Sequence, residues 1–445
     1  MKLRQDLLDA DSPAGIEVIQ ITTEPAVPWS HIYMEAQIST PDSQRFLLHR
    51  SAGPHGGRPD DPEHRYFVCD IGDDCALSPV TEEMGATAPS VTPDGRTVYY
   101  FVDETVVDGG RLTLKRVNLD GTGRETVLVL DGPLPDTTYR LSRPYPLSTI
   151  SSDGRRLALS GFLGDGACDQ APWGLAVFDL ERAAAQLILH GPSWCNVHPQ
   201  YSRSRRRAEC RDILVQENHG CAYDAQGVVA RLVSGAGADI HVIRDDGTGF
   251  RNMPWGRDGN EFCQGHQCWR GRSAWAITST STVDVDEQQL IEGRQAPHAG
   301  HVGAASPGAL RNDLSRNFRR PAFYHFATDA SGSRLVTDWV RDGRVCLYST
   351  TLGRPGVDAA GPWTYLLCTG SDWAKGSHVH PFLSPDGTWA FFNSDESGLL
   401  QAYMIRGLRH GSPSNNGKIA ARSAVRRTVR NDTGRTEQSL RGAQR

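Results

Sequence analysis

The chain has 445 residues, of which 38% are hydrophobic, with 46 glycines, 26 prolines and a formal net charge of −5. This composition favours a turn-rich all-β protein over a helical one. The acidic balance gives no reason to expect nucleic acid as a partner, and no apolar stretch reaches the roughly 18 residues of a membrane span. The opening residues MKLRQDLLDADSPAG lack the apolar core of a signal peptide, so we expect a cytoplasmic protein.

A unit of a short strand, a Ser/Thr-Pro-Asp-Gly type of turn and an apolar strand recurs along the chain. In chain order, the copies span 37–49, 89–102, 148–162, 199–216, 267–280, 326–340 and 381–394. Proline and glycine in the turn favour a tight reversal, and alternating apolar residues on both sides indicate strands. A second hairpin follows several copies, at 111–130, 173–190 and 239–255. Seven such units predict a seven-bladed β-propeller.

These repeats also set the predicted domain boundaries. Residues 1–16 are interpreted as an N-terminal lead-in, and the propeller is expected over 17–411. The strand at 17–23 has no partner in this count, and we expect it to complete the last blade and close the ring. Residues 281–320 are interpreted as a long loop insertion, a candidate lid over the site. The basic tail 412–445 is nearly free of large apolar residues and is predicted to be disordered.

Ten cysteines are scattered along the chain. Because no signal peptide is evident, we expect reduced and mostly buried thiols rather than disulfides. The motif Cys263-x-x-His266-x-Cys268 is compatible with half of a zinc site. No second half at zinc-like spacing is visible, so a zinc–thiolate site is the weaker interpretation.

Four of the predicted blades carry a histidine four residues before the turn, namely His198, His266, His325 and His380. In a symmetric ring of blades these imidazoles would converge near the axis at one face. His378 and His380 are two apart on a predicted strand and project to the same side. Together with His266 they can hold a divalent transition metal, with His325 as a fourth ligand or a supporting neighbour. The alternative is that each is an ordinary hydrogen-bonded histidine of the channel wall.

Further candidates lie nearby in the predicted fold. His219 ends an apolar strand and precedes a glycine, which suits a general base, although a turn histidine is the alternative. His198 stands one blade from the metal histidines and can orient the substrate or the base. Arg143, in YRLSRPYPLS, can pair with a carboxylate or be an exposed loop arginine. The arginine-rich run 203–207 lies in the turn at the opposite face and is interpreted as a solvated surface.

Over about residues 17–408 the chain resembles the oligogalacturonate lyase family. The most specific segments are GHQCWRG at 265–271, HVHPFLSPDG at 378–387 and HPQYS at 198–202. The resemblance implies a seven-bladed propeller that degrades pectin fragments. It also implies a manganese-type cation held at the positions of His266, His378 and His380.

The chain departs from the family pattern at two positions. A family glutamine ligand is replaced by Lys375, which cannot ligate while protonated, so either the ligand set differs or His325 takes that place. The family's catalytic histidine stands in a CHEGP-like context, whereas this chain reads QENHG, and His219 is the nearest match.

The reaction that the resemblance implies is β-elimination on a uronic acid. A base removes the proton next to the carboxylate, and the sugar oxygen on the neighbouring carbon leaves. A divalent metal on the carboxylate acts as a Lewis acid, and an imidazole serves as base. The sequence thus predicts a metal-dependent lyase that acts on short acidic oligosaccharides. Two alternatives stay open: a non-catalytic propeller that binds a protein or glycan, and a metal-dependent hydrolase or isomerase of another sugar acid.

Overall fold

The structure is a computed structural model. It describes residues 1–53, 56–57, 61–105, 110–164, 171–232, 237–255, 262–281, 300–304, 311–318, 323–341, 344–355, 360–372 and 378–408. Lys375, His298 and the tail 412–445 therefore lie outside the described residues. Among the described residues, no helix combines the length and the apolar character that a bilayer crossing requires.

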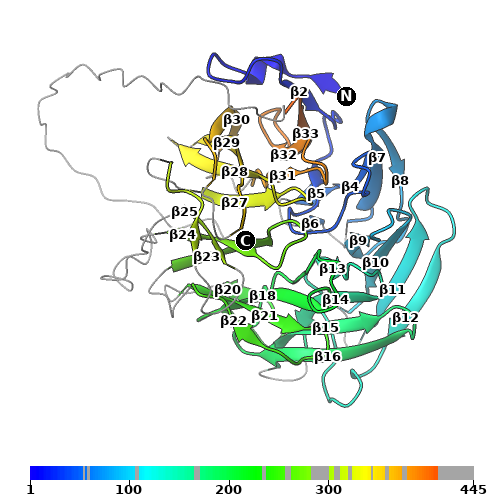
Figure 1. The fold of residues 1–445 in the computed structure, drawn as a ribbon. Helices are drawn as coiled ribbons and strands as arrows, with labels where there is room; N and C mark the ends of the chain where they lie inside the picture. The colour runs from blue at the N-terminus through cyan, green and yellow to red at the C-terminus, as the bar shows by residue number, and fades with distance from the viewer. Residues whose placement is uncertain are drawn as a thin grey trace, which may run out of the picture. The chain divides into compact units, whose positions relative to one another are not determined.

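Seven antiparallel sheets form the described part of the chain, and they are arranged as the blades of a β-propeller (Figure 1). The prediction of an all-β, seven-bladed propeller is confirmed. Blade one contains β3 (Trp29–His31), β4 (Arg45–Arg50), β7 (Arg65–Asp70) and β8 (Ala76–Pro79). Blade two contains β9 (Ala86–Val91), β10 (Thr97–Asp103), β11 (Leu112–Asn118) and β12 (Glu125–Leu130). Blade three contains β13 (Ser148–Ile150), β14 (Arg156–Phe162), β15 (Trp173–Asp179) and β16 (Ala184–Gly191).

The remaining blades follow the same order. Blade four contains β17 (Gln200–Tyr201), β18 (Asp212–Asn218), β21 (Ala238–Arg244) and β22 (Arg251–Asn252). Blade five contains β23 (Phe262–Trp269), β24 (Ala276–Ser281), β25 (Gly300–Ala304) and β26 (Asn312–Asp313). Blade six contains β27 (Phe323–Thr328), β28 (Arg334–Arg341), β29 (Arg344–Thr351) and β30 (Thr364–Asp372). Minor elements are η1 (Gln5–Leu7), η2 (Ile71–Asp73) and the two hairpins β5 (Ala52–Gly53)–β6 (Gly56–Gly57) and β19 (Ala222–Tyr223)–β20 (Val229–Arg231).

Blade seven is built from both ends of the described chain. It contains β31 (Phe382–Leu383), β32 (Ala390–Ser394) and β33 (Gln401–Arg406), with β2 (Glu17–Gln20) paired to β33 and β1 (Lys2–Leu3) paired to β2. Glu17 pairs with Arg406 and Gln20 with Tyr403. The early strand therefore closes the ring as predicted, and the outer part of the lead-in contributes a strand of its own, contrary to its interpretation as a mere lead-in.

The repeated turns show why the sequence units fold alike. In blade seven, Ser384 Oγ donates to Asp386 Oδ1 at 2.6 Å, and the same carboxylate oxygen accepts the backbone N–H of Thr388. Gly387 adopts a φ of 73°, which a residue with a Cβ rarely does. Blade two repeats this arrangement with Thr92 and Asp94. The Ser/Thr-x-Asp-Gly pattern thus supplies both the hydrogen bonds and the left-handed residue of each tight turn.

Blade five corrects the predicted boundaries of the insertion. The segment interpreted as a loop over 281–320 contains β25 and β26, the two outer strands of this blade. His301 lies on β25, is buried, and has its Nε2 2.9 Å from Thr337 Oγ1 of blade six. The prediction failed here because the two strands are short and separated from β24 by a long polar stretch. Residues 282–299 and 305–310 lie outside the described residues.

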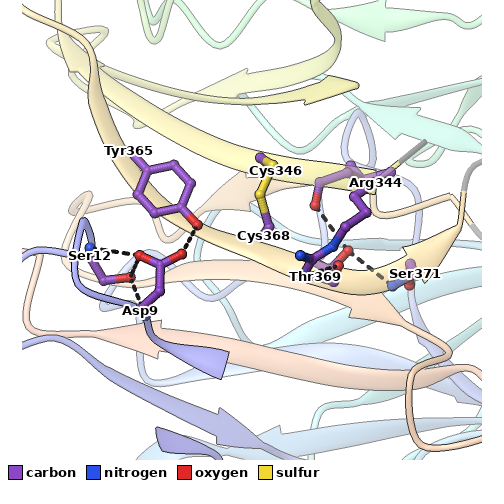
Figure 2. Close-up of a disulfide and its surroundings, with 9 residues drawn as sticks. Asp9, Ser12, Arg344, Cys346, Tyr365, Cys368, Thr369 and Ser371 are labelled. Atoms are coloured by element: carbon purple, nitrogen blue, oxygen red, sulfur yellow. Dashed lines mark hydrogen bonds between the residues drawn. A yellow bond between two sulfur atoms is a disulfide. The ribbon is translucent and has the colours of Figure 1, made fainter. Parts of the chain in front are cut away.

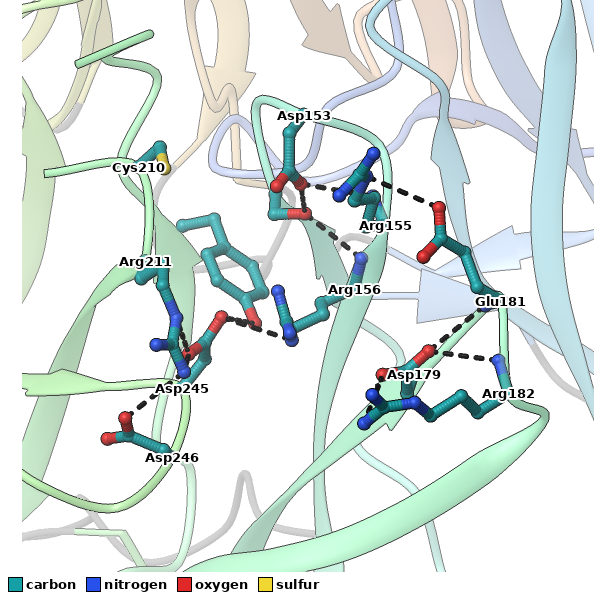
Figure 3. A network of polar contacts seen from close by, with 12 residues as sticks. Asp153, Arg155, Arg156, Asp179, Glu181, Arg182, Cys210, Arg211, Asp245 and Asp246 are labelled. Atoms are coloured by element: carbon teal, nitrogen blue, oxygen red, sulfur yellow. Dashed lines mark hydrogen bonds and ion pairs between the residues drawn. The ribbon is translucent and has the colours of Figure 1, made fainter. Parts of the chain in front are cut away.

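A buried carboxylate links blades three and four. Asp245 accepts a hydrogen bond from Arg211 at 2.6 Å and forms a 3.6 Å ion pair with Arg156 of blade three (Figure 3). Tyr201 also donates to Asp245, at 3.3 Å. A buried charge is costly in free energy unless it is paired and hydrogen-bonded. Two guanidinium groups and a hydroxyl offset the cost of burying Asp245, and the same contacts hold blade three against blade four.

One disulfide joins neighbouring strands of blade six. Cys346 of β29 faces Cys368 of β30 and is bonded to it (Figure 2). The expectation of reduced thiols is wrong for this pair, because their opposed positions on adjacent strands were not visible in the sequence. Among the other described cysteines, six are free thiols: Cys69, Cys75, Cys195, Cys210, Cys221 and Cys268. In the same view, Tyr365 donates to Asp9 at 2.6 Å, which ties the N-terminal segment to blade six.

Candidate metal and acid–base site

Three histidines from two neighbouring blades come together. His325 lies on β27, and His378 and His380 lie just before β31. One ligand nitrogen from each lies within 4.8 Å of the others, and the three form a candidate metal site among the described residues. Nitrogens bound at about 2.1 Å to one ion can be no more than about 4.2 Å apart. Small side-chain shifts would therefore suffice for all three to bind a common cation.

His325 is held in place by a carboxylate. Its Nδ1 lies 2.7 Å from Asp338 Oδ2, and its backbone N–H donates to Asp338 Oδ1 at 2.8 Å. Both side chains are essentially buried. A carboxylate that accepts from one ring nitrogen fixes the tautomer and directs the other nitrogen, Nε2, towards a metal. Asp338 lies within β28, the second strand of blade six, in the segment TDWVR.

Burial sets the protonation of these groups. It lowers the pKa of His325 well below its usual range and also lowers the pKa of His378. Both imidazoles are therefore neutral near pH 7, the form that binds a metal. Burial raises the pKa of Asp338 to about 7, while hydrogen bonds from the backbone of His325 and Tyr324 act in the opposite direction.

The pair in blade seven is positioned by a bend instead of a strand. The sequence prediction placed His378 and His380 on one strand, but β31 begins only at Phe382. His380 has a φ of 45°, a left-handed conformation that is uncommon for a residue with a side chain. The ring centroids of His378 and His380 lie 5.2 Å apart, so the bend still brings them together. Residues held in such strained conformations often occur at functional sites.

His266 lies next to this cluster. It is half-buried on β23 of blade five, and its ring centroid is 4.5 Å from that of His325. The structure thus places His325 between His266 and the blade-seven pair. His325, which the sequence analysis treated as a fourth ligand or a neighbour, stands at the centre of the group.

The fourth histidine in register, His198, is bound to a buried acid. Its Nδ1 lies 2.7 Å from Glu35 Oε2, and both side chains are almost fully buried. Tyr145 Oη lies 3.3 Å from the other ring nitrogen, Nε2. With Nδ1–H donated to Glu35, Nε2 carries the lone pair and accepts from Tyr145. This tautomer is the one that a general base requires.

Tyr33 connects His198 with the metal histidines. Its ring centroid is 5.2 Å from that of His198 and 4.5 Å from that of His380. All three side chains are buried. The acid-backed histidine and the histidine cluster are thus parts of one site at the end of the channel where the innermost strands begin.

The other two predicted residues lie elsewhere on blades three and four. His219 follows β18, and its Nε2 is 2.8 Å from Asp239 Oδ2. Arg143 is half-buried in the segment that enters blade three, two residues before Tyr145, with its backbone N–H donating to Thr105 Oγ1. Arg143 also has a positive φ, of 44°.

The sequence analysis missed Glu35, Tyr33 and Tyr145. Glu35 had one visible signal, since it is a lone carboxylate within the apolar stretch IYMEA, which lies between the first two strands of blade one. The zinc–thiolate interpretation receives no support among the described residues, where Cys263 and Cys268 join no group of metal ligands. Burial raises the pKa of Cys268 to about 12, which disfavours the thiolate that zinc requires.

Two solved structures of oligogalacturonate lyases are similar to this chain. One, in complex with manganese, is 19% identical, covers 91% of this chain and 95% of its own, and has a TM-score of 0.65. The other, from Vibrio parahaemolyticus, is 15% identical, covers 89% and 95%, and has a TM-score of 0.61. No protein-family model and no curated protein sequence matches the chain. At these identities, the likeness establishes the architecture of the seven-bladed propeller.

Proposed function

We propose that this protein is a metal-dependent lyase that cleaves short uronate-containing oligosaccharides by β-elimination. The observation that carries the proposal is the convergence of three imidazoles beside an acid-backed histidine in one site. A cation held by ring nitrogens, with a catalytic imidazole nearby, suits the removal of a proton from the carbon next to a carboxylate. The similarity of the fold to two oligogalacturonate lyases, one of them a manganese complex, also supports this proposal.

In this proposal His325, His378 and His380 hold a divalent cation of the manganese type, with His266 as a further ligand. Asp338 keeps the His325 ring in position through the 2.7 Å contact at Nδ1. When bound, the cation supplies Lewis-acid stabilisation of the negative charge that develops on the substrate carboxylate, worth several kcal/mol. The nitrogen ligands fit a transition metal better than magnesium or calcium, which prefer oxygen.

His198 is the residue that we assign as base. Glu35 holds its Nδ1–H, so Nε2 can take the proton from the carbon next to the carboxylate. A substrate would displace the Tyr145 hydroxyl from Nε2, and Glu35 would stabilise the imidazolium that results. We prefer His198 to His219 because Tyr33 connects its ring directly with His380. Arg143, close to Tyr145 in sequence, would pair with a substrate carboxylate.

The test is an assay of purified protein on oligogalacturonate, with and without chelator, that follows the ultraviolet absorbance of the unsaturated product. Metal content is measured on the same preparation. We expect one transition-metal ion per chain and activity that the chelator abolishes and added Mn²⁺ restores. A protein that binds metal without forming unsaturated product would contradict the lyase assignment and favour another sugar-acid reaction. A protein with neither would favour a propeller that only binds a partner.

A further inference from the structure

The opposite end of the central channel holds a second cavity. Its volume is about 140 Å³, and its described lining comes from the inner part of all seven blades, for example Gln37 in blade one, Thr92 in blade two and Ala327 in blade six. On each blade these residues follow the innermost strand or lie near its end. The cavity is therefore axial, and the metal histidines lie at the other ends of the same strands.

Three arginines line this cavity. Arg203 and Arg205 follow β17, and Arg272 follows β23. Arg203 is half-buried, whereas Arg205 and Arg272 are exposed. Of the described lining residues, none is an aspartate or glutamate. The sequence analysis interpreted the run 203–207 as a solvated surface, and the structure turns part of that run towards the axis.

Within the described part of the chain, the three guanidinium groups lack an ion-pair partner, and Asp329 acts on Arg203 only through its more distant charge. None of them forms an ion pair or a side-chain hydrogen bond with another described residue. In the same turn, by contrast, Arg206 pairs with Glu209 at 3.4 Å. Burial lowers the pKa of Arg203, and the charge of Arg272 acts in the same direction, whereas Cys268 and Asp329 act in the opposite direction. Like charges gathered without a partner cost free energy, and a bound anion would remove that cost.

Other polar side chains of the cavity lining already form hydrogen bonds within the protein. Thr328 Oγ1 donates to the carbonyl of Trp269, and Ser152 Oγ donates to the carbonyl of Ser204. The side chain of Gln37 bonds to the backbone of Ile150. The charged donors of the lining are the guanidinium groups, which recognise carboxylate and phosphate groups through paired hydrogen bonds.

We propose that this cavity binds a small organic anion through a carboxylate or phosphate group, held by Arg203, Arg205 and Arg272. Apolar neighbours such as Ile38, Val91 and Leu383 would contact the body of the ligand. The arginines are not part of the histidine cluster: Arg203 and Arg205 follow β17, whereas His198 precedes it. The proposal does not rest on the lyase assignment.

The test is calorimetric titration of metal-free protein at low ionic strength with two probes, inorganic phosphate and galacturonate. We expect at least one probe to bind, and both Arg203→Gln and Arg272→Gln to weaken that binding at least tenfold. Arg203→Lys, which keeps the charge but loses the paired donors, should give an intermediate loss. Arg207→Gln is the matched control, since it removes the same charge from the same turn outside the cavity lining. Circular dichroism checks that each variant is folded.

The choice of probe identifies the source of the anion. Binding of phosphate alone indicates a phosphorylated ligand, binding of galacturonate alone indicates a sugar acid, and binding of both supports a general oxyanion site. His380→Ala should leave the titration unchanged, because it alters the other end of the channel. The proposal is overturned if neither probe binds at about 10 mM, if Arg207→Gln weakens binding as much as Arg203→Gln, or if His380→Ala abolishes it.

Discussion

Glu35 and His198, which are 163 positions apart in the sequence, meet through a 2.7 Å contact between Oε2 and Nδ1. Glu35 lies between β3 and β4 of the first blade, and His198 lies two residues before β17, the innermost strand of the fourth. Burial raises the pKa of Glu35, and the neighbouring His198 acts in the opposite direction. The pair thus places an acid behind a histidine, with the two groups supplied by different blades.

This pair gives a direct test of the base. His198→Ala should lower kcat on oligogalacturonate by about 10² to 10⁴, the usual contribution of a general base. Glu35→Gln should lower kcat less and shift the pH profile, because the imidazole remains but loses the acid that orients it. Metal content should be unchanged in both variants. If His219→Ala instead abolishes activity while His198→Ala retains it, the assignment of the base is wrong.

Asp338 should matter for metal affinity without being a ligand. Asp338→Asn removes the acceptor that orients His325, and the loss of such a partner typically weakens metal binding by about 10- to 100-fold. Equilibrium dialysis against Mn²⁺ measures this change. His190→Ala, at an exposed position on β16, is the control and should bind metal normally. If Asp338→Asn binds Mn²⁺ with normal affinity, the contact between Asp338 and His325 is not what prepares the His325 ring to bind the cation.

Buried histidines predict that the protein loses stability as the pH falls. Burial lowers the pKa of His31 to about 3, whereas an unfolded histidine titrates near pH 6.5. Between these values the unfolded chain binds the extra proton, so the free energy of unfolding rises with pH and is lost as pH falls below about 6.5. For His31 alone, this loss amounts to about 1.4 kcal/mol between pH 7.5 and 5.5.

His31→Gln measures that contribution. The free energy of unfolding in urea should depend on pH less steeply in this variant than in the wild type, by about the same 1.4 kcal/mol over that interval. His190→Gln changes an exposed histidine and should leave the pH dependence as it is. An identical slope for His31→Gln and the wild type would show that His31 does not stay neutral in the folded protein.

The disulfide of blade six should contribute to stability. It joins Cys346 and Cys368, which are 22 positions apart in the sequence, and closing a loop of this size typically contributes about 2–4 kcal/mol. Cys346→Ser should lower the free energy of unfolding by that order. Cys210→Ser, which removes a half-buried free thiol, serves as the comparison. If reduction of the wild type leaves its stability unchanged, the bond adds nothing to the fold.

The sequence predicted the propeller well because each blade repeats its own turn chemistry. The hairpins and the closing strand at 17–23 follow from local patterns of glycine, aspartate and alternating apolar residues. The outer strands of blade five escaped this reasoning, since β26 has only two residues and carries little pattern. The disulfide also escaped, because strand register decides which cysteines face each other.

The candidate site could be predicted only in part. Histidines in shared register were visible, and His325, His378 and His380 do converge. Their supporting carboxylates were not visible as partners, because Glu35 and Asp338 reach their histidines through the closure of the ring and the pairing of two strands. The arginines of the second cavity looked like surface charges, because a sequence does not show which side of a turn faces the axis.

The construction of blade seven has a consequence for how the protein matures during synthesis. The ribosome produces His325 well before His378 and His380, and the strand that closes their blade, Glu17–Gln20, is among the first segments to emerge. A nascent polypeptide that stops before residue 378 therefore carries a single imidazole of the three-histidine cluster. In the proposed function, the complete set of three imidazoles therefore exists only late in translation, after the segment that leads into blade seven has been made.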